Sequence, residues 1–148
     1  MAHRLDYVAE ARKSDREVWL SGPASSSEIA RLEEAIGLPL PESYRFFLAS
    51  AGSLSIGDVI VSGIIDGDPL LADGGSAFAD TLRARESQGI PGHFLVIQPD
   101  ADAPHCLELS SSLAAEQPVV CFQASTRSAK RIAPSFDQWY LTFILGRV

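Results

Sequence analysis

Two neighbouring helix-forming segments constrain the fold of this chain more strongly than any other feature of its 148 residues. Ser25 and Glu28 have the S-x-x-E spacing of a capping box, in which both side chains satisfy backbone N–H groups at the start of a helix. The apolar residues that follow recur at helical spacing as far as Gly37, which suits the left-handed residue at a helix end. Pro41 fits the first turn of a second helix, and the apolar pattern behind it continues to Gly52. The segment therefore predicts two helices joined by a stiff corner.

The corner sequence LPLP (38–41) is interpreted as architecture and not as part of an active site. Proline and glycine at these positions are explained by helix starts and helix ends alone. Trp139 fits the apolar stripe of a later helix and is interpreted as a core residue. The residues predicted to set the fold are Gly37, Pro39, Pro41, Gly52 and Trp139.

Helical signals also occur at both ends of the chain. The apolar spacing from Leu5 predicts a first helix that ends near Ser14, and glycine and proline within 19–27 predict a linker there. Ser135 and Gln138 repeat the capping-box spacing. The helix that they start is predicted to bury an apolar stripe made of Phe136, Trp139, Phe143 and Ile144.

Between these helices the pattern changes to that of strands. Glycines and β-branched residues over 55–67 predict one or two strands with tight turns. Further strands are predicted over 94–98, 105–109 and 118–122. Ser76 is predicted to cap a helix that runs to Gln88 and has on its inner side Phe78, Ala79 and Leu82.

Helices, then strands, then a helix are typical of the α+β class and not of alternating βαβ units. We expect helices from 25–52 and 135–145 to pack on a mostly antiparallel sheet. A chain of this length is expected to form a single domain, 1–148, with an N-terminal helix and linker over 1–22 and a core over 25–145.

Composition narrows the class of protein further. The charged start of the chain lacks the apolar stretch of a signal peptide, and no segment has the roughly 18 consecutive apolar residues of a membrane span. Cys106 and Cys121 are too few for a disulfide framework. We therefore expect a cytoplasmic protein without membrane contact.

No constellation in the sequence has the spacing that metal binding or catalysis requires. His105, Cys106 and Cys121 lack the paired spacing of a zinc site, and residues 105 and 106 would point to opposite faces of a strand. The acidic loop at 66–73 lacks the terminal glutamate of a calcium loop. Nucleophile-elbow, phosphate-loop and dinucleotide glycine motifs are absent from the sequence. The sequence predicts no catalytic residue, no metal and no cofactor.

The net charge of −7 is concentrated in one part of the chain. Residues 54–110 hold nine acidic and two basic side chains, whereas residues 111–148 carry a net charge of +2. Acidic residues can serve solubility alone, but on one shared face their summed field would attract a basic partner. A nucleic-acid partner is not expected, because the sequence lacks a basic cluster with interleaved aromatic residues. The residues predicted to form the acidic face are Asp58, Asp66, Asp68, Asp73, Asp80, Asp100, Asp102 and Glu108.

Three segments, taken in order, resemble the SUKH superfamily, which is named partly for a fungal cell-wall regulator and is widespread among bacterial immunity proteins. They are EIARLEEAIGLPLPESYRFFLASAG (28–52), HCLEL (105–109) and IAPSFDQWYLTFI (132–144). The chain departs from the family pattern at Ala51, where Asn is common, and at Gln123, where an acidic residue is frequent. The resemblance implies a non-enzymatic α+β domain, commonly an antitoxin that occludes a secreted bacterial toxin.

These observations lead to three functional hypotheses. The first is an immunity protein that binds and neutralises a basic toxin domain through its acidic surface. The second is a regulatory scaffold that docks on an intracellular protein. The third is a small hydrolase or ligand-binding protein that uses His93, His105 and nearby carboxylates. The sequence makes no prediction of the oligomeric state.

Overall fold

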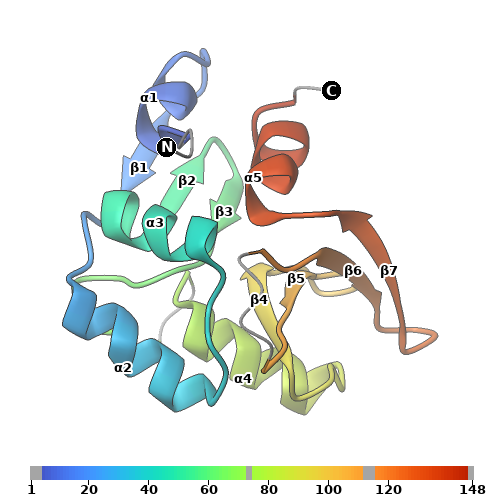
Figure 1. Ribbon diagram of the computed structural model, residues 1–148. Coiled ribbons are helices and arrows are strands. Elements are labelled where there is room, and N and C mark those ends of the chain that lie inside the picture. The colour runs from blue at the N-terminus through green and yellow to red at the C-terminus, as the bar shows by residue number, and fades with distance from the viewer. Residues whose placement is uncertain (1–4, 73–74, 112–115, 147–148) are drawn as a thin grey trace.

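The computed structural model describes residues 5–72, 75–111 and 116–146. Helices and strands follow one another in the order expected for an α+β protein (Figure 1). The N-terminal half contains α1 (Tyr7–Arg12), β1 (Val18–Leu20), α2 (Ser26–Ile36), α3 (Glu42–Ala51), β2 (Leu54–Ile56) and β3 (Val59–Val61). The C-terminal half contains α4 (Ala77–Ser87), β4 (Phe94–Gln98), β5 (His105–Glu108), β6 (Val119–Gln123), β7 (Ser128–Ala133), α5 (Phe136–Trp139) and a π-helical segment, η1 (Tyr140–Ile144).

Within the described residues, the strands form two antiparallel sheets, of three strands in the order β1-β2-β3 and of four strands in the order β4-β5-β6-β7. The α+β class and the antiparallel pairing are confirmed. The expected single sheet is divided in two, and the two parts meet where Ser62 N, just after β3, donates to Ile97 O of β4 at 2.7 Å.

The helix caps predicted for α2 are present. Ser25 Oγ accepts from Glu28 N at 3.2 Å, and Glu28 Oε1 accepts from Ser25 N at 2.7 Å, which completes the capping box. Gly37 ends α2 in the left-handed conformation, with φ 83°. Pro41 occupies the N-cap position of α3 with extended backbone, so this helix begins one residue later, at Glu42.

Gly52 carries a constraint beyond ending α3. Its φ is 72°, and a Cβ atom there would overlap the backbone oxygen of Gly22 and lie 2.8 Å from Ile64 O. The segment before α2 therefore packs directly on the end of α3, and Gly22 N donates to Ala51 O at 2.9 Å. Only glycine fits this close backbone approach.

An aromatic cluster joins the two ends of the chain. Tyr7 of α1 packs edge-to-face on Phe47 of α3 and on Tyr140, with ring centroids 5.4 and 5.2 Å apart. Phe136 of α5 lies 5.1 Å from the ring of Tyr44. All five side chains are at most 1% exposed. The core was predicted over 25–145, but α1 also contributes buried side chains to it.

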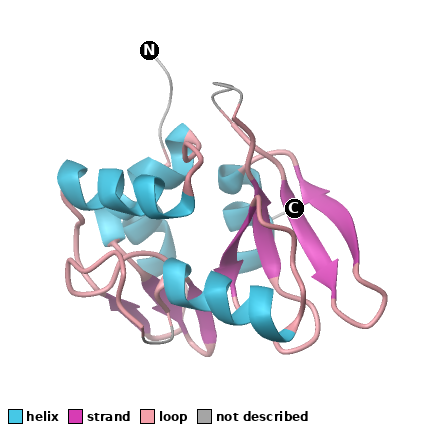
Figure 2. Ribbon diagram, turned by 90° about the horizontal axis from the view of Figure 1, so that it is seen from below, coloured by secondary structure: helices cyan, strands magenta, loops and turns pink. Residues whose placement is uncertain are grey.

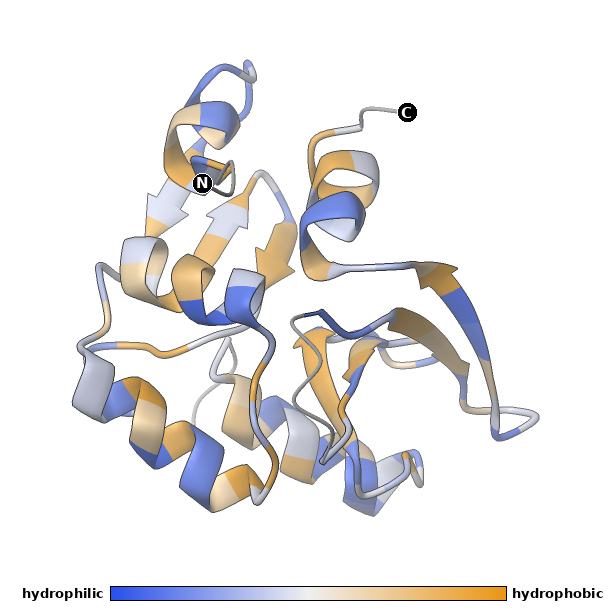
Figure 3. Cartoon of the chain, viewed as in Figure 1, coloured by the Kyte–Doolittle hydropathy of each residue, from blue (hydrophilic) through white to orange (hydrophobic). Residues whose placement is uncertain are grey.

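A smaller apolar cluster lies between α4 and the opposite face of the four-stranded sheet. Its members are Ala84, Ile90, Phe94, Val96, Cys106, Val120 and Phe122. The prediction that residues 105 and 106 face opposite sides of the sheet is confirmed, because Cys106 lies in this cluster whereas His105 contacts Trp139. This sheet therefore contributes side chains to an apolar cluster on each face, and the colour of β4 in Figure 3 marks its residues as mostly hydrophobic.

Two strands were missed by the sequence prediction. Residues 19–27 were expected to be a linker, but the chain forms β1 there, paired with β2 from Val18↔Ile56 to Leu20↔Leu54. The second missed strand is β7, which pairs with β6 and forms one edge of its sheet. β1 shows a period-two pattern over only a few residues and pairs with β2, more than thirty residues later, whereas β7 pairs with β6 in a hairpin.

Two residues predicted to be buried are exposed. Leu82 is 44% exposed because the inner side of α4 is formed by smaller residues, Ala77, Ala79, Thr81 and Ala84, and by Asp80. Phe143 is 41% exposed. The winding changes at Tyr140, where Leu145 N donates to Tyr140 O five residues back, so a spacing of seven from Phe136 no longer returns to the same face.

Within the described part of the chain, none of the helices is long and apolar enough to cross a membrane.

Candidate protein-binding surface

The eight carboxylates predicted to share a face lie in several different environments. Asp80 is 6% exposed and belongs to the interior. Its Oδ2 accepts from Ser62 Oγ at 2.6 Å and from Gly75 N at 3.2 Å, and its Oδ1 pairs with Arg83 Nη2 at 2.6 Å. The prediction that Asp80 contributes to an exposed acidic face is wrong. Because the inner side of α4 is made mostly of small residues, this carboxylate has room to reach Ser62 and Gly75. Asp80 also adds to the effect of burial that raises the pKa of Tyr44.

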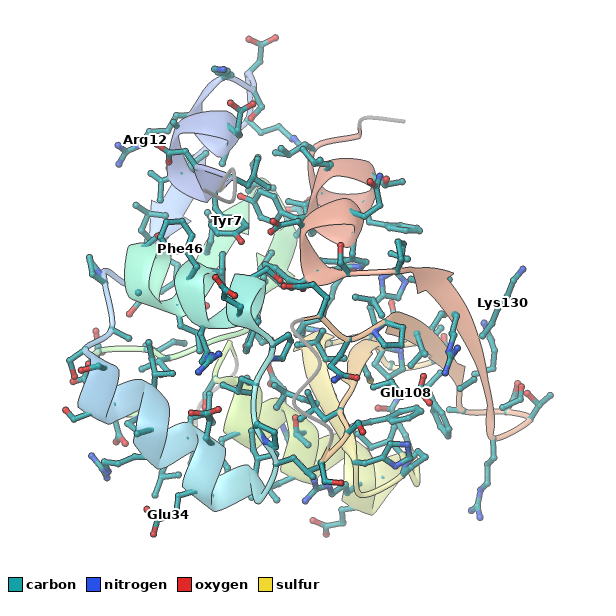
Figure 4. The ribbon with its side chains drawn as sticks, in the orientation of Figure 1. Tyr7, Arg12, Glu34, Phe46, Glu108 and Lys130 are labelled. Carbon is teal, nitrogen blue, oxygen red and sulfur yellow. The ribbon has the colours of Figure 1, made fainter. Side chains whose placement is uncertain are left out.

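Glu108 is partly buried on β5, and its charge is offset within the protein. Its Oε1 accepts from Arg131 Nε of β7 at 3.1 Å, and its Oε2 lies 4.0 Å from His93 Nε2. Figure 4 shows Glu108 directed toward the side chains of its own sheet. This carboxylate therefore offers little free charge to a partner.

Asp100 and Asp102 lie in the turn between β4 and β5. Asp100 Oδ1 accepts from the backbone N–H groups of Asp102 and Ala103 at 2.9 and 2.8 Å, and these hydrogen bonds lower its pKa. Gln88, at the end of α4, donates to Asp100 O at 2.9 Å. The turn borders a groove of about 590 Å³ against α4. These hydrogen bonds of Asp100 and Gln88 hold the turn in shape.

The remaining predicted carboxylates lie near the three-stranded sheet or outside the described residues. Asp58 is exposed in the turn between β2 and β3. Asp66 and Asp68 are exposed in the loop after β3, where Asp68 Oδ1 accepts from Leu70 N at 3.0 Å. Asp73 lies outside the described residues.

The outer face of the three-stranded sheet exposes two large apolar side chains. Trp19 of β1 and Ile60 of β3 are 48% and 38% exposed, whereas the residues that alternate with them pack on the core. The register pairs Trp19 with Ser55 and Ser55 with Ile60. Directly opposed residues of antiparallel strands point to the same face, so these three side chains form one row across the sheet.

Carboxylates lie at both ends of β1. At its start, Gly57 N donates to Glu17 O at 2.8 Å, which holds the turn containing Asp58 beside Glu17. At its end, Asp66 N donates to Ser21 Oγ at 2.8 Å. We call this region the Trp19 surface, and it consists of Trp19, Ser55 and Ile60 with the rim residues Glu17, Asp58 and Asp66.

The cation next to this rim in the sequence is Arg16, whose aliphatic stem passes beside Gly57 of the turn, where an added Cβ would lie 3.4 Å from its Cδ. Arg16 extends toward η1, where its Nη2 donates to Ile144 O at 2.8 Å. Ile144 belongs to the buried core, on the side of the sheet away from Trp19. An exposed tryptophan with carboxylates at its border suits a partner that is both apolar and basic.

The sequence prediction listed two of the three rim carboxylates but missed the apolar centre. Trp19 was assigned to a linker because Gly22 and Pro23 follow closely. The alternation of Glu17, Trp19 and Ser21 with Val18 and Leu20 is a short period-two pattern, and it was the one available signal for an outward-facing tryptophan.

On the described strands β5 and β6, His105 and Cys106 make contacts within the fold. His105 Nδ1 accepts from Trp139 Nε1 at 2.9 Å, and burial lowers the pKa of this histidine. Burial raises the pKa of Cys106 to about 12, and it also raises the pKa of Cys121, which lies opposite His105 on β6. A nucleophilic cysteine needs the opposite shift. Among the described residues, no group of three His, Cys, Asp or Glu side chains is arranged to hold a metal ion.

The described residues form an α+β fold with an aromatic core and an exposed, acid-rimmed sheet face. The family model SUKH_5, described as SMI1-KNR4 cell-wall, matches residues 5–145. The match covers nearly the whole chain, so the protein belongs to this family, and the resemblance found in three sequence segments is confirmed. No curated protein sequence matches the chain.

Proposed function

We propose that this protein is a non-enzymatic, cytoplasmic protein-binding domain of the immunity type, and that it neutralises a basic bacterial toxin domain through the Trp19 surface. The observation that carries the proposal is Trp19, a half-exposed tryptophan in an ordered strand with carboxylates at both ends. Tryptophan is among the residues most often found at the energetic centre of protein interfaces.

The apolar centre and the acidic rim of this surface would contribute to different quantities, the affinity and the association rate. Burial of the Trp19 and Ile60 side chains supplies affinity in proportion to the apolar area removed from water. The carboxylates of Glu17, Asp58 and Asp66 remain at the solvated border, where charges mainly accelerate association. Enzymes that attack nucleic acids need basic surfaces to contact phosphate, so their inhibitors gain from negative charge.

A second candidate is a regulatory scaffold that uses the same surface without neutralising a toxin. The match to a family model described by a cell-wall regulator favours this candidate. Co-expression separates the two functions. An immunity protein restores growth to cells that produce the toxin encoded beside it, whereas a scaffold binds its partner without such protection.

The experiment is a pull-down with the wild-type protein, identification of the partner by mass spectrometry, and affinity measurement with variants. Trp19→Ala is expected to weaken binding at least about 30-fold, since hot-spot residues contribute about 2 kcal/mol or more. Leu82→Ala is the matched control, because Leu82 is similarly exposed (44%) but lies on α4. Equal affinities of Trp19→Ala and the wild type would refute the assignment of this surface.

The rim is tested separately through association rates. The double variant Asp58→Asn and Asp66→Asn is expected to slow association several-fold at low salt and to flatten its salt dependence. Asparagine suits position 66, whose φ of 54° is tolerated by Asn as by Asp. An unchanged salt dependence would show that these carboxylates do not attract the partner.

A further inference from the structure

The β6–β7 hairpin projects from the side of the molecule away from β1 (Figures 1 and 2). Within the described residues, β7 pairs with β6 alone and forms the outer edge of the four-stranded sheet. Residues 128–131 of β7 are exposed. In an edge strand, every second residue directs its N–H and C=O groups outward, so this segment presents a short row of unpaired backbone donors and acceptors.

The hairpin is basic although the protein as a whole is acidic. Arg127, Lys130 and Arg131 lie on it, and residues 119–133 contain no Asp or Glu. One of these charges is partly offset, because Arg131 Nε donates to Glu108 Oε1. Figure 4 shows Lys130 pointing away from the body of the molecule. The edge therefore combines free backbone groups with positive side chains.

A hollow continues this edge at the end of β7. It has a volume of about 550 Å³ and is lined by Pro118, Arg131, Ile132, Ala133 and Pro134. The register shifts between Val119 and Val120, which pair with Ala133 and Arg131, so Ile132 has no opposed residue. Such a bulge ends regular pairing and turns the chain. The result is a mainly apolar recess beside the last exposed backbone groups.

We propose that β7 binds an extended acidic segment of a partner protein, which adds to the four-stranded sheet as a fifth strand. The backbone of the segment would pair with the outward groups of residues 128–131. Its carboxylates would lie on the face of the sheet that carries Lys130, since Arg131 points to the opposite face and is already paired with Glu108. An apolar side chain at the end of the segment would enter the recess at Ile132. This surface is separate from the Trp19 surface and does not depend on it.

Two other occupants fit the same edge less well. A second copy of β7 would place Lys130 and Arg131 near their own counterparts, and like charges on neighbouring strands repel. A nucleic acid would meet only three cations on a protein whose net charge is −7. An acidic peptide satisfies both the backbone groups and the charges.

The test uses the full-length protein and three capped eight-residue peptides. One alternates Glu with Val, one alternates Lys with Val, and one has the Glu–Val sequence with proline at the two central positions. We expect the Glu–Val peptide alone to bind, with slower amide exchange in β7 observed by NMR. The proline peptide keeps the charge but cannot form a continuous strand. Equal binding of the proline peptide would overturn strand addition.

Variants locate the binding site on the molecule. Lys130→Glu is expected to weaken binding of the Glu–Val peptide about tenfold. Lys13→Glu is the control, because it makes the same charge change on an exposed residue of the α1 end. Trp19→Ala is expected to leave peptide binding unchanged. A negative result for strand addition at β7 is therefore distinguishable from a negative result for partner binding at the Trp19 surface. Equal effects of the two lysine variants, or tighter binding of a single-stranded oligothymidine at the hairpin, would overturn the proposal.

Discussion

The two sheets of this protein leave different parts of themselves open to solvent. The three-stranded sheet packs on the core through one face and exposes Trp19 and Ile60 on the other. The four-stranded sheet is covered on both faces, by the main core and by α4, and its open part is the β7 edge. The first surface offers apolar area with an acidic rim, whereas the second offers backbone groups with basic side chains.

This difference separates two ways in which one small domain can bind proteins. Binding to a sheet face is driven by burial of side chains, so affinity depends on one or two apolar residues. Binding to a sheet edge is driven by backbone pairing, so it depends on the partner being extended. The opposite charges of the two surfaces also favour different partners, and one partner need not displace the other.

The two tryptophans give the largest contrast. Trp139 is fully buried, and Trp139→Ala is expected to lower the free energy of unfolding by about 3–5 kcal/mol, as deletion of a large aromatic core side chain does. Trp19→Ala removes an exposed side chain and is expected to change the free energy of unfolding by less than about 0.5 kcal/mol. Urea denaturation followed by far-UV circular dichroism measures both. A similar loss in both variants would mean that Trp19 has a structural role and is not a free binding residue.

The sequence predicted best the elements that are specified by neighbouring residues. The capping box of Ser25 and Glu28, the helix end at Gly37 and the cap of Ser76 on α4 each depend on contacts within a few residues. Such signals can be read locally because the partners are close in the sequence. The helices of this fold were therefore predictable, apart from the change to π-helical winding at Tyr140.

The site was predictable only in part because its residues are brought together by distant pairing. β1 is three residues long and is fixed by β2, more than thirty residues later. Counting charges identified Asp58 and Asp66, but it could not distinguish them from Asp80, whose carboxylate is drawn inside by Ser62 and Gly75. Whether an acidic residue faces solvent depends on the tertiary partners of its side chain. Those partners do not appear in a charge count.

A smaller effect is expected where the two sheets are tied together. Asp80→Ala leaves Ser62 Oγ and Gly75 N without their acceptor, and it removes the partner of Arg83. Loss of buried hydrogen bonds of this kind costs about 2–3 kcal/mol. Asp58→Ala is the control and is expected to stay within about 0.5 kcal/mol of the wild type, since Asp58 is exposed in a turn. Chemical denaturation of both variants checks the prediction, and equal stabilities would show that the Asp80 contacts contribute little.

The smallest effect is a pH dependence that belongs to the four-stranded sheet. Burial lowers the pKa of His105 in the folded protein, below the value of about 6.5 expected in the unfolded chain. The unfolded chain therefore binds more protons, and stability should fall as the pH decreases from about 6.5 toward the lower folded pKa. Protonation of Nδ1 would also remove the acceptor of the Trp139 hydrogen bond.

His105→Gln should remove this part of the pH dependence, because the amide does not titrate in this range while its oxygen can still accept from Trp139. His93→Gln is the matched control, since His93 is exposed and lies beside Glu108 on the same sheet. The measurement is the urea midpoint at pH 7 and at pH 5 for each variant. If His105→Gln keeps the wild-type change of the urea midpoint with pH and His93→Gln loses it, the pH dependence does not come from the buried contact of His105 with Trp139.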